Sequence, residues 1–255
     1  MRLATWNVNS LKVRLPHVLD WLASADCDVL CLQETKLTDD KFPAAELEGA
    51  GYTVAFNGQK TYNGVAILSR LPMHDVVRDI PDYADAQKRV IAATIGGVRI
   101  VCAYIPNGQS LESDKYRYKL EWLDALQAYI RALTGAHTQV ALLGDYNIAP
   151  EDRDVHDPAV WKDQVLVSLP ERAHFQALIG QGFADCFRLF EQPEKMYSWW
   201  DYRMLGFRRN AGLRIDHILA SGSLAATCRA CVIDKAPRRR EQPSDHTPVV
   251  ADFSL

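Results

Sequence analysis

Short apolar runs recur along the whole chain, and they limit the possible folds more than any other feature of the sequence. Most are about four to eight residues long, rich in Val and Ile, and bounded by Gly, Pro, Asn or Asp, which is typical of β-strands. The runs are RLATW, DVLCLQ, YTVAF, GVAILS, RVIAATI, VRIVCAYI, QVALLG, LRIDHILA and TPVVADF. Because these runs are almost continuously apolar, we expect sheets that are covered by helices on one face and by more sheet on the other.

Three helices are expected between the strands. Apolar residues recur at helical spacing in the first two, at Leu15, Val18, Leu19 and Leu22, and at Leu120, Leu123, Leu126, Ile130 and Leu133. Pro170 begins the third, PERAHFQALIGQG, which ends in glycines. No Gly/Ser-rich linker, repeat or low-complexity tract divides the chain, so we expect one α/β domain over residues 1–255. The Asp-rich segment 150–170 is expected to be a long, functional loop.

The composition is that of an ordinary globular protein, with 48% hydrophobic and 24% charged residues. The net charge of -3 gives no overall basic field, which argues mildly against a DNA partner, although a local basic face would suffice. No secretory signal or membrane-spanning run is visible, so a cytoplasmic protein is expected. The six cysteines are scattered, and CRAC at 228–231 lacks a second ligand pair. We therefore expect reduced, structural thiols rather than a zinc site.

Polar residues stand at the ends of many of the expected strands. They are Asn7 and Asn9, Glu34 and Lys36, Tyr104 and Asn107, Asp145 and Asn147, Asp216 and His217, and Asp245 and His246. Each has a plain structural explanation, because Asn and Asp favour turns. However, Asp145 and Asn147 are two apart after an apolar run and would face the same way on a continuing strand. Glu34 also follows an apolar strand, where a charge is costly unless it is paired or binds a metal.

If these strand ends meet at one edge, they form a site rich in oxygen with a single imidazole. Such a ligand set, without thiolates, suits Mg²⁺ or Mn²⁺ better than zinc. It fits the hydrolysis of a phosphate ester, in which the cation polarises a phosphoryl oxygen and a carboxylate orients or deprotonates water.

Eight motifs, in order, resemble those of the exonuclease III family of DNA repair nucleases and AP endonucleases. They are TWNVNSL, LCLQETK, YNGVAILSR, YIPNG, LLGDYNIAP, YSWWDYR, GLRIDHILAS and PSDHTPVV. The resemblance covers the chain from residue 2 to about residue 253 and includes the wider endonuclease/exonuclease/phosphatase superfamily. It implies a four-layer α-β-β-α sandwich, with two packed mixed sheets flanked by helices, and a Mg²⁺-dependent activity with Mn²⁺ as a possible substitute.

The resemblance also implies roles for individual residues. Glu34 would be the principal metal ligand, and the wider metal set would comprise Asn7, Asp145, Asn147, Asp245 and His246. The catalytic set would be Tyr104 beside the scissile phosphate, Asp145 on the attacking water, Asn147 on the phosphate, and His246 on the phosphoryl oxygens, oriented by Asp216. Asn9 stands where some relatives carry Asp, which leaves the number of metals open. The water-activating base is Asp145 or His246.

Two kinds of feature favour DNA as the substrate. YSWWDYR matches the nuclease branch, in which an aromatic residue packs on the sugar and bases, and basic residues near the site could follow phosphates. The expected DNA contacts are Lys36, Arg89, Asn107, Trp199, Arg203 and Leu213, with Lys115, Arg117, Arg208 and Arg209 as further candidates. Alternatively, each cation is a solvated surface charge, and Trp199 and Trp200 are core residues. APRRREQ is a phosphate contact or a soluble loop, and Arg214 is expected to form a structural ion pair.

The resemblance therefore implies a nuclease of base excision repair that acts on duplex DNA, and it suggests a monomer. The enzyme would cleave 5′ to abasic sites, trim blocked 3′ ends and degrade duplex DNA from 3′ ends, in a balance that stays open. Trp199, Leu213 and the loop before Pro170 would form the pocket for the abasic sugar. Two alternatives remain: a phosphatase or phosphodiesterase acting on a lipid or inositol phosphate, and a DNA-binding module that has lost catalysis.

Overall fold

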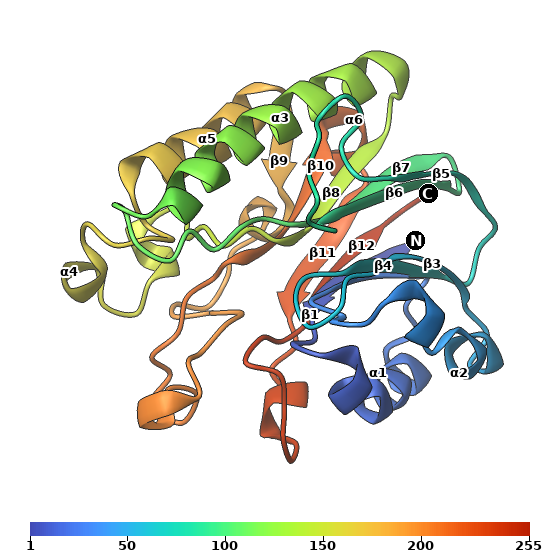
Figure 1. Cartoon of the computed structure of the whole chain (residues 1–255), viewed down its shortest axis with the longest axis horizontal. Helices are drawn as coiled ribbons and strands as arrows, with labels where there is room; N and C mark the ends of the chain where they lie inside the picture. The colour runs from blue at the N-terminus through green and yellow to red at the C-terminus, as the bar shows by residue number, and fades with distance from the viewer.

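The structure, a computed structural model, describes residues 1–255 and consists of two facing β-sheets with helices on their outer sides (Figure 1). The first sheet has the order β11 (Cys228–Ile233), β12 (Val249–Phe253), β1 (Arg2–Asn7), β2 (Val29–Gln33), β4 (Val65–Ser69) and β3 (Thr53–Asn57). The second has the order β5 (Met73–Arg78), β6 (Val90–Ile95), β7 (Val98–Tyr104), β8 (Val140–Asp145), β10 (Asp216–Ser221) and β9 (Phe183–Asp185). Both sheets are mixed, because β1–β2 and β7–β8 are parallel pairs and the others are antiparallel.

The protein has six helices, and the longer ones lie on the outer faces of the two sheets. The six are α1 (Leu11–Ala25), α2 (Ala44–Gly49), α3 (Asp114–Ala136), α4 (Pro158–Trp161), α5 (Leu169–Gly180) and α6 (Gly222–Ala225). Figure 1 shows α1 and α2 outside the first sheet and α3 and α5 outside the second. Short 3₁₀ turns occur at η1 (Asp39–Lys41), η2 (Asp152–Asp154), η3 (Cys186–Leu189), η4 (Arg203–Leu205) and η5 (Pro237–Arg239). The predicted four-layer α-β-β-α sandwich is confirmed.

The three expected helices form, and local capping sets where they begin. The Ser113 side chain accepts a hydrogen bond from the backbone of Tyr116 at the start of α3. Ser168 and Glu171 form a reciprocal capping box at the start of α5. The segment 150–170, predicted as a loop, contains η2 and α4, since the Asp157 side chain caps the first turn of α4. That part of the loop prediction was wrong because local capping overrode the polar composition.

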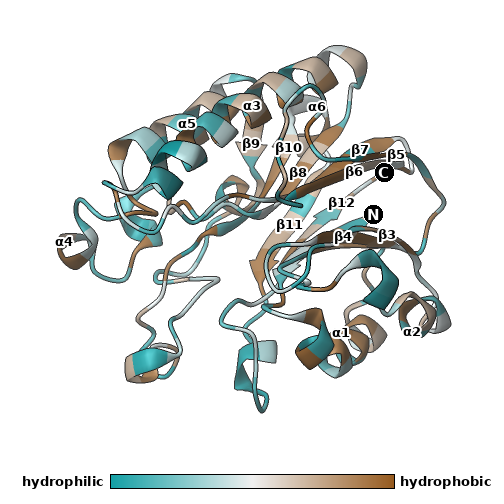
Figure 2. Ribbon diagram, in the orientation of Figure 1, coloured by the Kyte–Doolittle hydropathy of each residue, from teal (hydrophilic) through white to brown (hydrophobic).

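Apolar side chains fill three layers, one between the sheets and one beneath each helical layer. Strand β7 shows why the apolar runs are continuous. Ile100 and Cys102 face the other sheet, whereas the alternate residues Val101 and Ala103 pack toward α3 and α5. Figure 2 shows the same contrast, with largely brown strands and helices that carry both brown and teal residues.

Strand register brings several polar residues to one edge of the sandwich. In the second sheet, Asp145 at the end of β8 lies beside Tyr104 on one side and Asp216 on the other. In the first sheet, β1 ends at Asn7, beside Gln33 at the end of β2. The ends of both sheets therefore meet where the sequence predicted a site. No helix of the protein is long and apolar enough to cross a membrane.

Replacement of Ile100 by Ala should lower the free energy of unfolding by about 2–5 kcal/mol, because it removes a fully buried side chain from between the sheets. Urea unfolding at constant m would measure the change. The exposed strand residue Val232 is the matched control, and Val232→Ala should change stability by less than about 0.5 kcal/mol. A loss below about 1 kcal/mol for Ile100→Ala would contradict this account of the core.

Candidate active site at the strand ends

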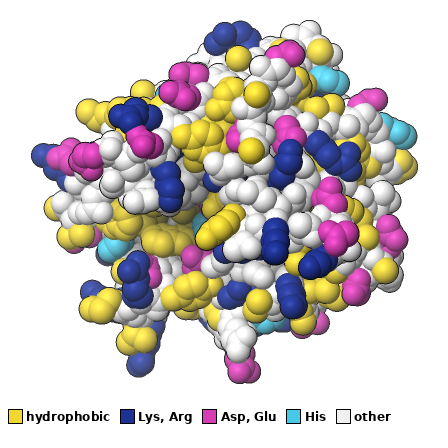
Figure 3. Space-filling view, in the orientation of Figure 1, with side chains coloured by type: hydrophobic (Ala, Val, Ile, Leu, Met, Phe, Trp, Pro, Cys, Tyr) yellow, Lys and Arg dark blue, Asp and Glu magenta, His cyan; other side chains and the backbone are white.

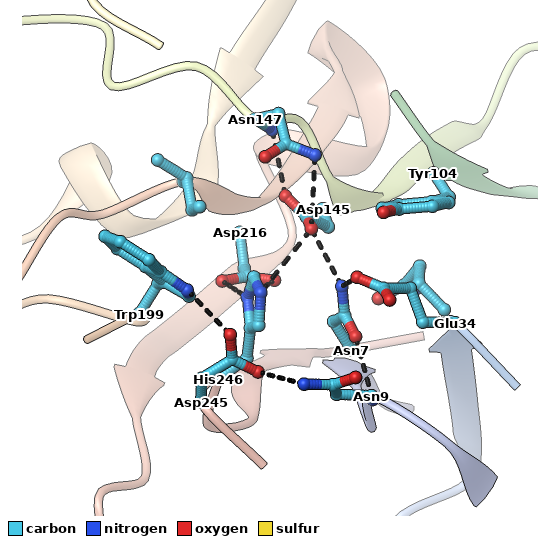
Figure 4. A network of polar contacts seen from close by, with 12 residues as sticks. Asn7, Asn9, Glu34, Tyr104, Asp145, Asn147, Trp199, Asp216, Asp245 and His246 are labelled. Carbon is cyan, nitrogen blue, oxygen red and sulfur yellow. Dashed lines mark hydrogen bonds and ion pairs between the residues drawn. The ribbon is translucent and has the colours of Figure 1, made fainter. Parts of the chain in front are cut away.

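Glu34, Asp145 and His246 form the centre of the site (Figure 4). One ligand atom from each residue lies within 4.8 Å of the others. Asn7 lies between the two acids and donates from Nδ2 to Glu34 Oε1 and to Asp145 Oδ2, both at 2.9 Å. These residues follow β2, end β8, precede β12 and end β1, so both sheets supply the cluster. Two carboxylates and one imidazole are a donor set that fits a divalent cation when the imidazole is neutral.

His246 lies between two buried carboxylates. Its Nδ1 is 2.9 Å from Asp216 Oδ2, and its Nε2 is 3.6 Å from Asp145 Oδ2. Burial alone would lower the pKa of His246, but the charges of Asp216 and Asp145 outweigh that effect and raise the pKa to about 10. The ring is therefore an imidazolium at neutral pH in the absence of a metal. The neighbouring acid in the sequence, Asp245, does not contact the ring, because its carboxylate hydrogen bonds elsewhere.

Asp145 is poised to exchange a proton near neutral pH. Burial raises its pKa to about 7, with Asp216 acting in the same direction, while His246 and the hydrogen bond from Asn7 act against the rise. A divalent cation bound beside the carboxylate would lower this pKa, since it favours the charged form. Asp145 therefore has an environment in which a carboxylate can work as a general base.

Asn147 and Asn107 present amide groups next to Asp145. Asn147 has a positive φ of 49°, a conformation that Asn tolerates better than most residues. Its backbone N–H donates to Asp145 Oδ1 at 2.9 Å, and its Nδ2 donates to the carbonyl of Ile105 at 2.9 Å. Asn107 Nδ2 in turn donates to Asn147 Oδ1 at 3.1 Å. This arrangement holds two amide side chains at the point where β7 and β8 end.

Arg89 packs against the ring of Tyr104. The guanidinium lies 4.7 Å from the centre of the Tyr104 ring and donates to the Tyr104 carbonyl at 3.1 Å. Arg89 Nε and Nη2 both donate to Gln87 Oε1, and Arg89 is only 8% exposed. Burial, and then the charges of Glu34 and Asp145, raise the pKa of the Tyr104 phenol, so it stays protonated. Arg89 was predicted to contact DNA. In the structure it packs against Tyr104, a predicted catalytic residue, and lines an adjacent cavity.

Asp245 belongs to a neighbouring network rather than to the three-residue cluster. Its Oδ1 accepts from Asn9 Nδ2 at 2.9 Å, and its Oδ2 accepts from Trp199 Nε1 at 3.0 Å. The ammonium of Lys36 bridges this network to the centre, at 2.5 Å from Asn9 Oδ1 and 2.9 Å from Glu34 Oε2. A cation entering beside Glu34 would meet Lys36 there.

The remaining predicted DNA contacts lie on two different kinds of surface. Trp199 is half-buried and pairs with buried Leu213 through backbone hydrogen bonds of 3.0 Å, so the two side chains lie together beside Asp245. The ring of Trp161 packs edge-on against the ring of Trp199, with 6.4 Å between the ring centres. By contrast, the Arg203 side chain is 86% exposed on a projecting loop and pairs with Asp201. The alternative of a core residue applies to Trp200, which is fully buried.

Several supporting residues escaped the sequence analysis. Ser244 donates from Oγ to the carbonyl of Asn7 at 2.7 Å and accepts from the backbone of His246 at 3.2 Å. Ser198 Oγ accepts from the backbone of Ile215 and of Asp216 at 3.1 and 3.0 Å. Both serines belong to quoted motifs, YSWWDYR and PSDHTPVV, and that membership is the one signal that could have identified them. Arg214 pairs with Asp154 and Asp185 inside the protein, in agreement with the structural ion pair expected for it.

Known proteins place this fold and site in one group of enzymes. The sequence pattern of the Endonuclease/Exonuclease/phosphatase family matches residues 4–246, and the chain belongs to that family. The exodeoxyribonuclease III of Haemophilus influenzae is 37% identical over 99% of this chain and 100% of its own length. The family predicted from the eight motifs is thereby confirmed.

Two solved structures are similar over their whole length. The 3′-5′ exonuclease of Neisseria meningitidis is 47% identical and superposes with a TM-score of 0.98, with full coverage of both chains. An AP endonuclease from Archaeoglobus fulgidus is 39% identical with a TM-score of 0.96, again with full coverage of both. Both are named as nucleases, and neither favours the lipid or inositol phosphate alternative.

In the metal-free protein, the His246 ring should stay protonated until about pH 10, and Asp216→Asn should move the midpoint toward neutral pH by more than one unit. Because the folded pKa is raised, this imidazolium contributes stability that is complete below about pH 6.5 and is lost as pH rises through about 10. Ring NMR titration would measure both midpoints. His217 is the internal control, since burial lowers its pKa to about 4. An unchanged His246 midpoint in Asp216→Asn would contradict the assignment.

Proposed function

We propose that the chain is a DNA repair nuclease that hydrolyses phosphodiester bonds of duplex DNA at abasic sites and at blocked 3′ ends. It would use Mg²⁺, with Mn²⁺ as a substitute. The observation that carries the proposal is the convergence of Glu34, Asp145 and His246 at one edge of the sandwich, with Asp216 behind the imidazole. The family to which the chain belongs supports a metal-dependent hydrolase.

The metal would be held by Glu34, with Asn7 and Asp145 beside it, whereas the protonated ring of His246 would face the phosphate. When bound, Mg²⁺ supplies a positive charge that polarises the phosphoryl oxygen and stabilises charge in the transition state. Asn147 would hold the phosphate with its amide, and Asn107 orients that amide through a 3.1 Å hydrogen bond. Asp245 would act through Asn9, which it contacts at 2.9 Å.

Asp145 is our choice for the base that takes a proton from water. A base must be able to accept a proton, and His246 already carries one at neutral pH because its pKa is raised to about 10. Burial raises the pKa of Asp145 to about 7 without a metal, and a bound cation would lower it, so Asp145 would be ionised and able to accept the proton. The protonated His246 would instead donate to a phosphoryl oxygen, with Asp216 holding Nδ1. Tyr104 keeps its proton and would donate it toward the leaving oxygen.

Cavities and loops beside the site would hold the DNA. A cavity of about 760 Å³ opens next to Tyr104 and Asn107, and its walls include Arg89, Lys115 and the exposed Tyr62. Cations on such a wall can follow phosphates, and a tyrosine can pack on a sugar or base. On the other side of the site, the segments around η4 and η5 project from the body of the protein (Figure 1).

The η4 projection is suited to nucleic acid by its side chains. Figure 3 shows Lys and Arg together with hydrophobic side chains on this projection, and a hollow between it and its neighbour. The residues are Arg203, Met204, Leu205, Arg208 and Arg209. Lys36 and Trp199 would contact the substrate nearer the centre, whereas the fully buried Leu213 packs against Trp199. A structure of the Neisseria 3′ phosphatase, which is 46% identical with a TM-score of 0.98, holds a product DNA hairpin. That complex supports DNA as the ligand proposed here.

We also propose a monomer that works in the cytoplasm. All six cysteines are buried and free, which suits a reducing compartment. The site takes residues from both sheets of a single chain and needs no second copy to complete it.

Glu34→Gln and Asp145→Asn should each lower kcat at least about 100-fold on a duplex with one abasic-site analogue and on a duplex with a 3′-phosphate. Glu34→Gln removes charge at the metal, and Asp145→Asn removes the base. Gel-based cleavage with Mg²⁺ would measure turnover, and EDTA should abolish it. The exposed Glu46→Gln is the control and should keep wild-type activity. Wild-type turnover of inositol phosphates but of neither DNA substrate would overturn the proposal.

Removal of the Glu34 carboxylate should also weaken metal binding at least about tenfold, because it leaves fewer charged oxygen ligands. Mn²⁺ binding can be measured by electron paramagnetic resonance without any substrate. Glu46→Gln again provides the baseline. Equal Mn²⁺ affinity in Glu34→Gln and in the wild type would place the metal elsewhere.

A further inference from the structure

A fully buried ion pair between Lys119 on α3 and Glu171 on α5 lies behind the active site. Neither side chain is exposed to solvent. Taking two charges out of water is costly, and an apolar pair of similar size would often be at least as stable. Stability alone therefore does not explain why charges occupy this position, and their hydrogen bonds point to another role.

Each of the three Lys119 protons has one acceptor. One proton goes to Glu171 Oε1. The second goes to the carbonyl of Asn147 at 2.7 Å, and the third goes to the carbonyl of Asn107 at 3.2 Å. An ammonium has three donors and no acceptor, so its hydrogen-bonding capacity is used completely. Two of the three bonds hold the backbones of the residues whose amides line the site.

Glu171 extends the same network to the segment that precedes α5. Its Oε1 accepts from the backbone N–H of Leu166 at 3.0 Å, and its Oε2 accepts from Ser168 N at 3.1 Å and Ser168 Oγ at 2.5 Å. The carbonyl of Leu166 accepts from the backbone of Ala149 at 2.7 Å, just after the Asn147 turn. The pair thus fixes both sides of the loop that leaves β8.

The backbone at Asn147 needs such support. The residue has a positive φ, and its side chain must point to Ile105 and Asn107 while its N–H points to Asp145. The charge-assisted hydrogen bond from Lys119 to the Asn147 carbonyl fixes the orientation of the peptide that follows Asn147. In Figure 4 the amide of Asn147 lies directly beside Asp145, so a rotation of this peptide would move the amide away from the reacting centre.

We propose that Lys119 and Glu171 are positioning residues, which orient the Asn107 and Asn147 amides for the phosphate without touching it. The inference rests on the proposed function for the identity of the ligand. Turnover should therefore depend on the pair more strongly than DNA binding does, because many other contacts hold the DNA, whereas few groups hold the phosphate. A displacement of about 1 Å in a group near the reacting atoms can cost about 100-fold in rate.

The test is the double variant Lys119→Met/Glu171→Gln, which removes both charges and leaves no unpaired buried ion. We expect kcat on the 3′-phosphate duplex to fall about 10- to 100-fold, while the Kd for that duplex, measured with EDTA present, changes less than about threefold. Two-dimensional NMR should show shifted side-chain amide signals for Asn107 and Asn147. This measurement needs neither turnover nor DNA, so it tests the inference even if the wild type proves inactive on DNA.

Two matched controls separate positioning from general stability. Tyr116→Phe removes only the 2.6 Å contact with Ser168 Oγ and leaves the Lys119 bonds intact. Leu178→Ala loosens the packing of α5 without touching the ion pair. Both should keep kcat within about twofold of the wild type at a temperature well below their Tm. If Leu178→Ala loses as much activity as the double variant, the role of the pair is merely structural and the inference is wrong.

A second variant covers the case in which the double variant does not fold. Glu171→Gln removes the charge beside Lys119 and keeps one carbonyl oxygen, which can accept from Leu166 or from Ser168 but not from both. It should lower kcat about three- to tenfold and shift the same two amide signals. Wild-type kcat and unshifted amides in a folded Glu171→Gln protein would overturn the inference. Complete inactivity of the wild type on every DNA substrate would instead count against the proposed function alone.

Discussion

A hydrogen bond of 2.9 Å from Asn7 Nδ2 to Asp145 Oδ2 joins the two sheets at the edge where the site lies. Asn7 ends β1 in the first sheet, and Asp145 ends β8 in the second. The two strands can meet there because side chains of both sheets interlock along their whole facing surface. A shift of one sheet against the other would lengthen this contact. The apolar layer between the sheets is therefore what sets the distance between the acids of the site.

The buried position of these acids gives them their chemistry. In water a carboxylate would be ionised and an imidazole largely neutral at pH 7. Here burial raises the pKa of Asp145 to about 7, while the acids on either side of His246 raise its pKa to about 10. Both pKa values are raised, but the consequences differ. Asp145 can accept a proton near neutral pH, whereas His246 can donate one. Asp216 matters to both, since its charge disfavours ionisation of Asp145 and favours protonation of His246.

The sequence predicted the strand ends well because the signal is local. An apolar run followed by Asp145 and Asn147, or by Glu34, identifies both the end of a strand and the polar group delivered there. The partners of these groups were harder to predict. Arg89 reaches Tyr104 through the pairing of β6 with β7, and Lys119 reaches Asn147 only because α3 packs on the sheet.

Asp245 illustrates the same limit from another direction. The motif PSDH indicates a polar turn, and alternation along a strand separates Asp245 from His246. It does not reveal that Trp199 Nε1 and Asn9 Nδ2 take the two carboxylate oxygens. Trp199 comes from a loop more than 40 positions away, and Asn9 comes from the turn after β1, more than 230 positions away. Local sequence patterns therefore predicted where the site lies, whereas contacts between distant segments determine the partners of each residue within it.

The distribution of charge reconciles a slightly acidic protein with an anionic substrate. The net charge is -3, so the molecule as a whole does not attract DNA. At the centre of the site, acids are concentrated and a bound divalent cation would offset them. Around it, Lys36, Lys115 and the arginines of the η4 projection face solvent or line cavities. Attraction in such an arrangement acts over roughly a Debye length of about 8 Å, so the local cations govern the approach of a phosphate backbone and the distant acids do not.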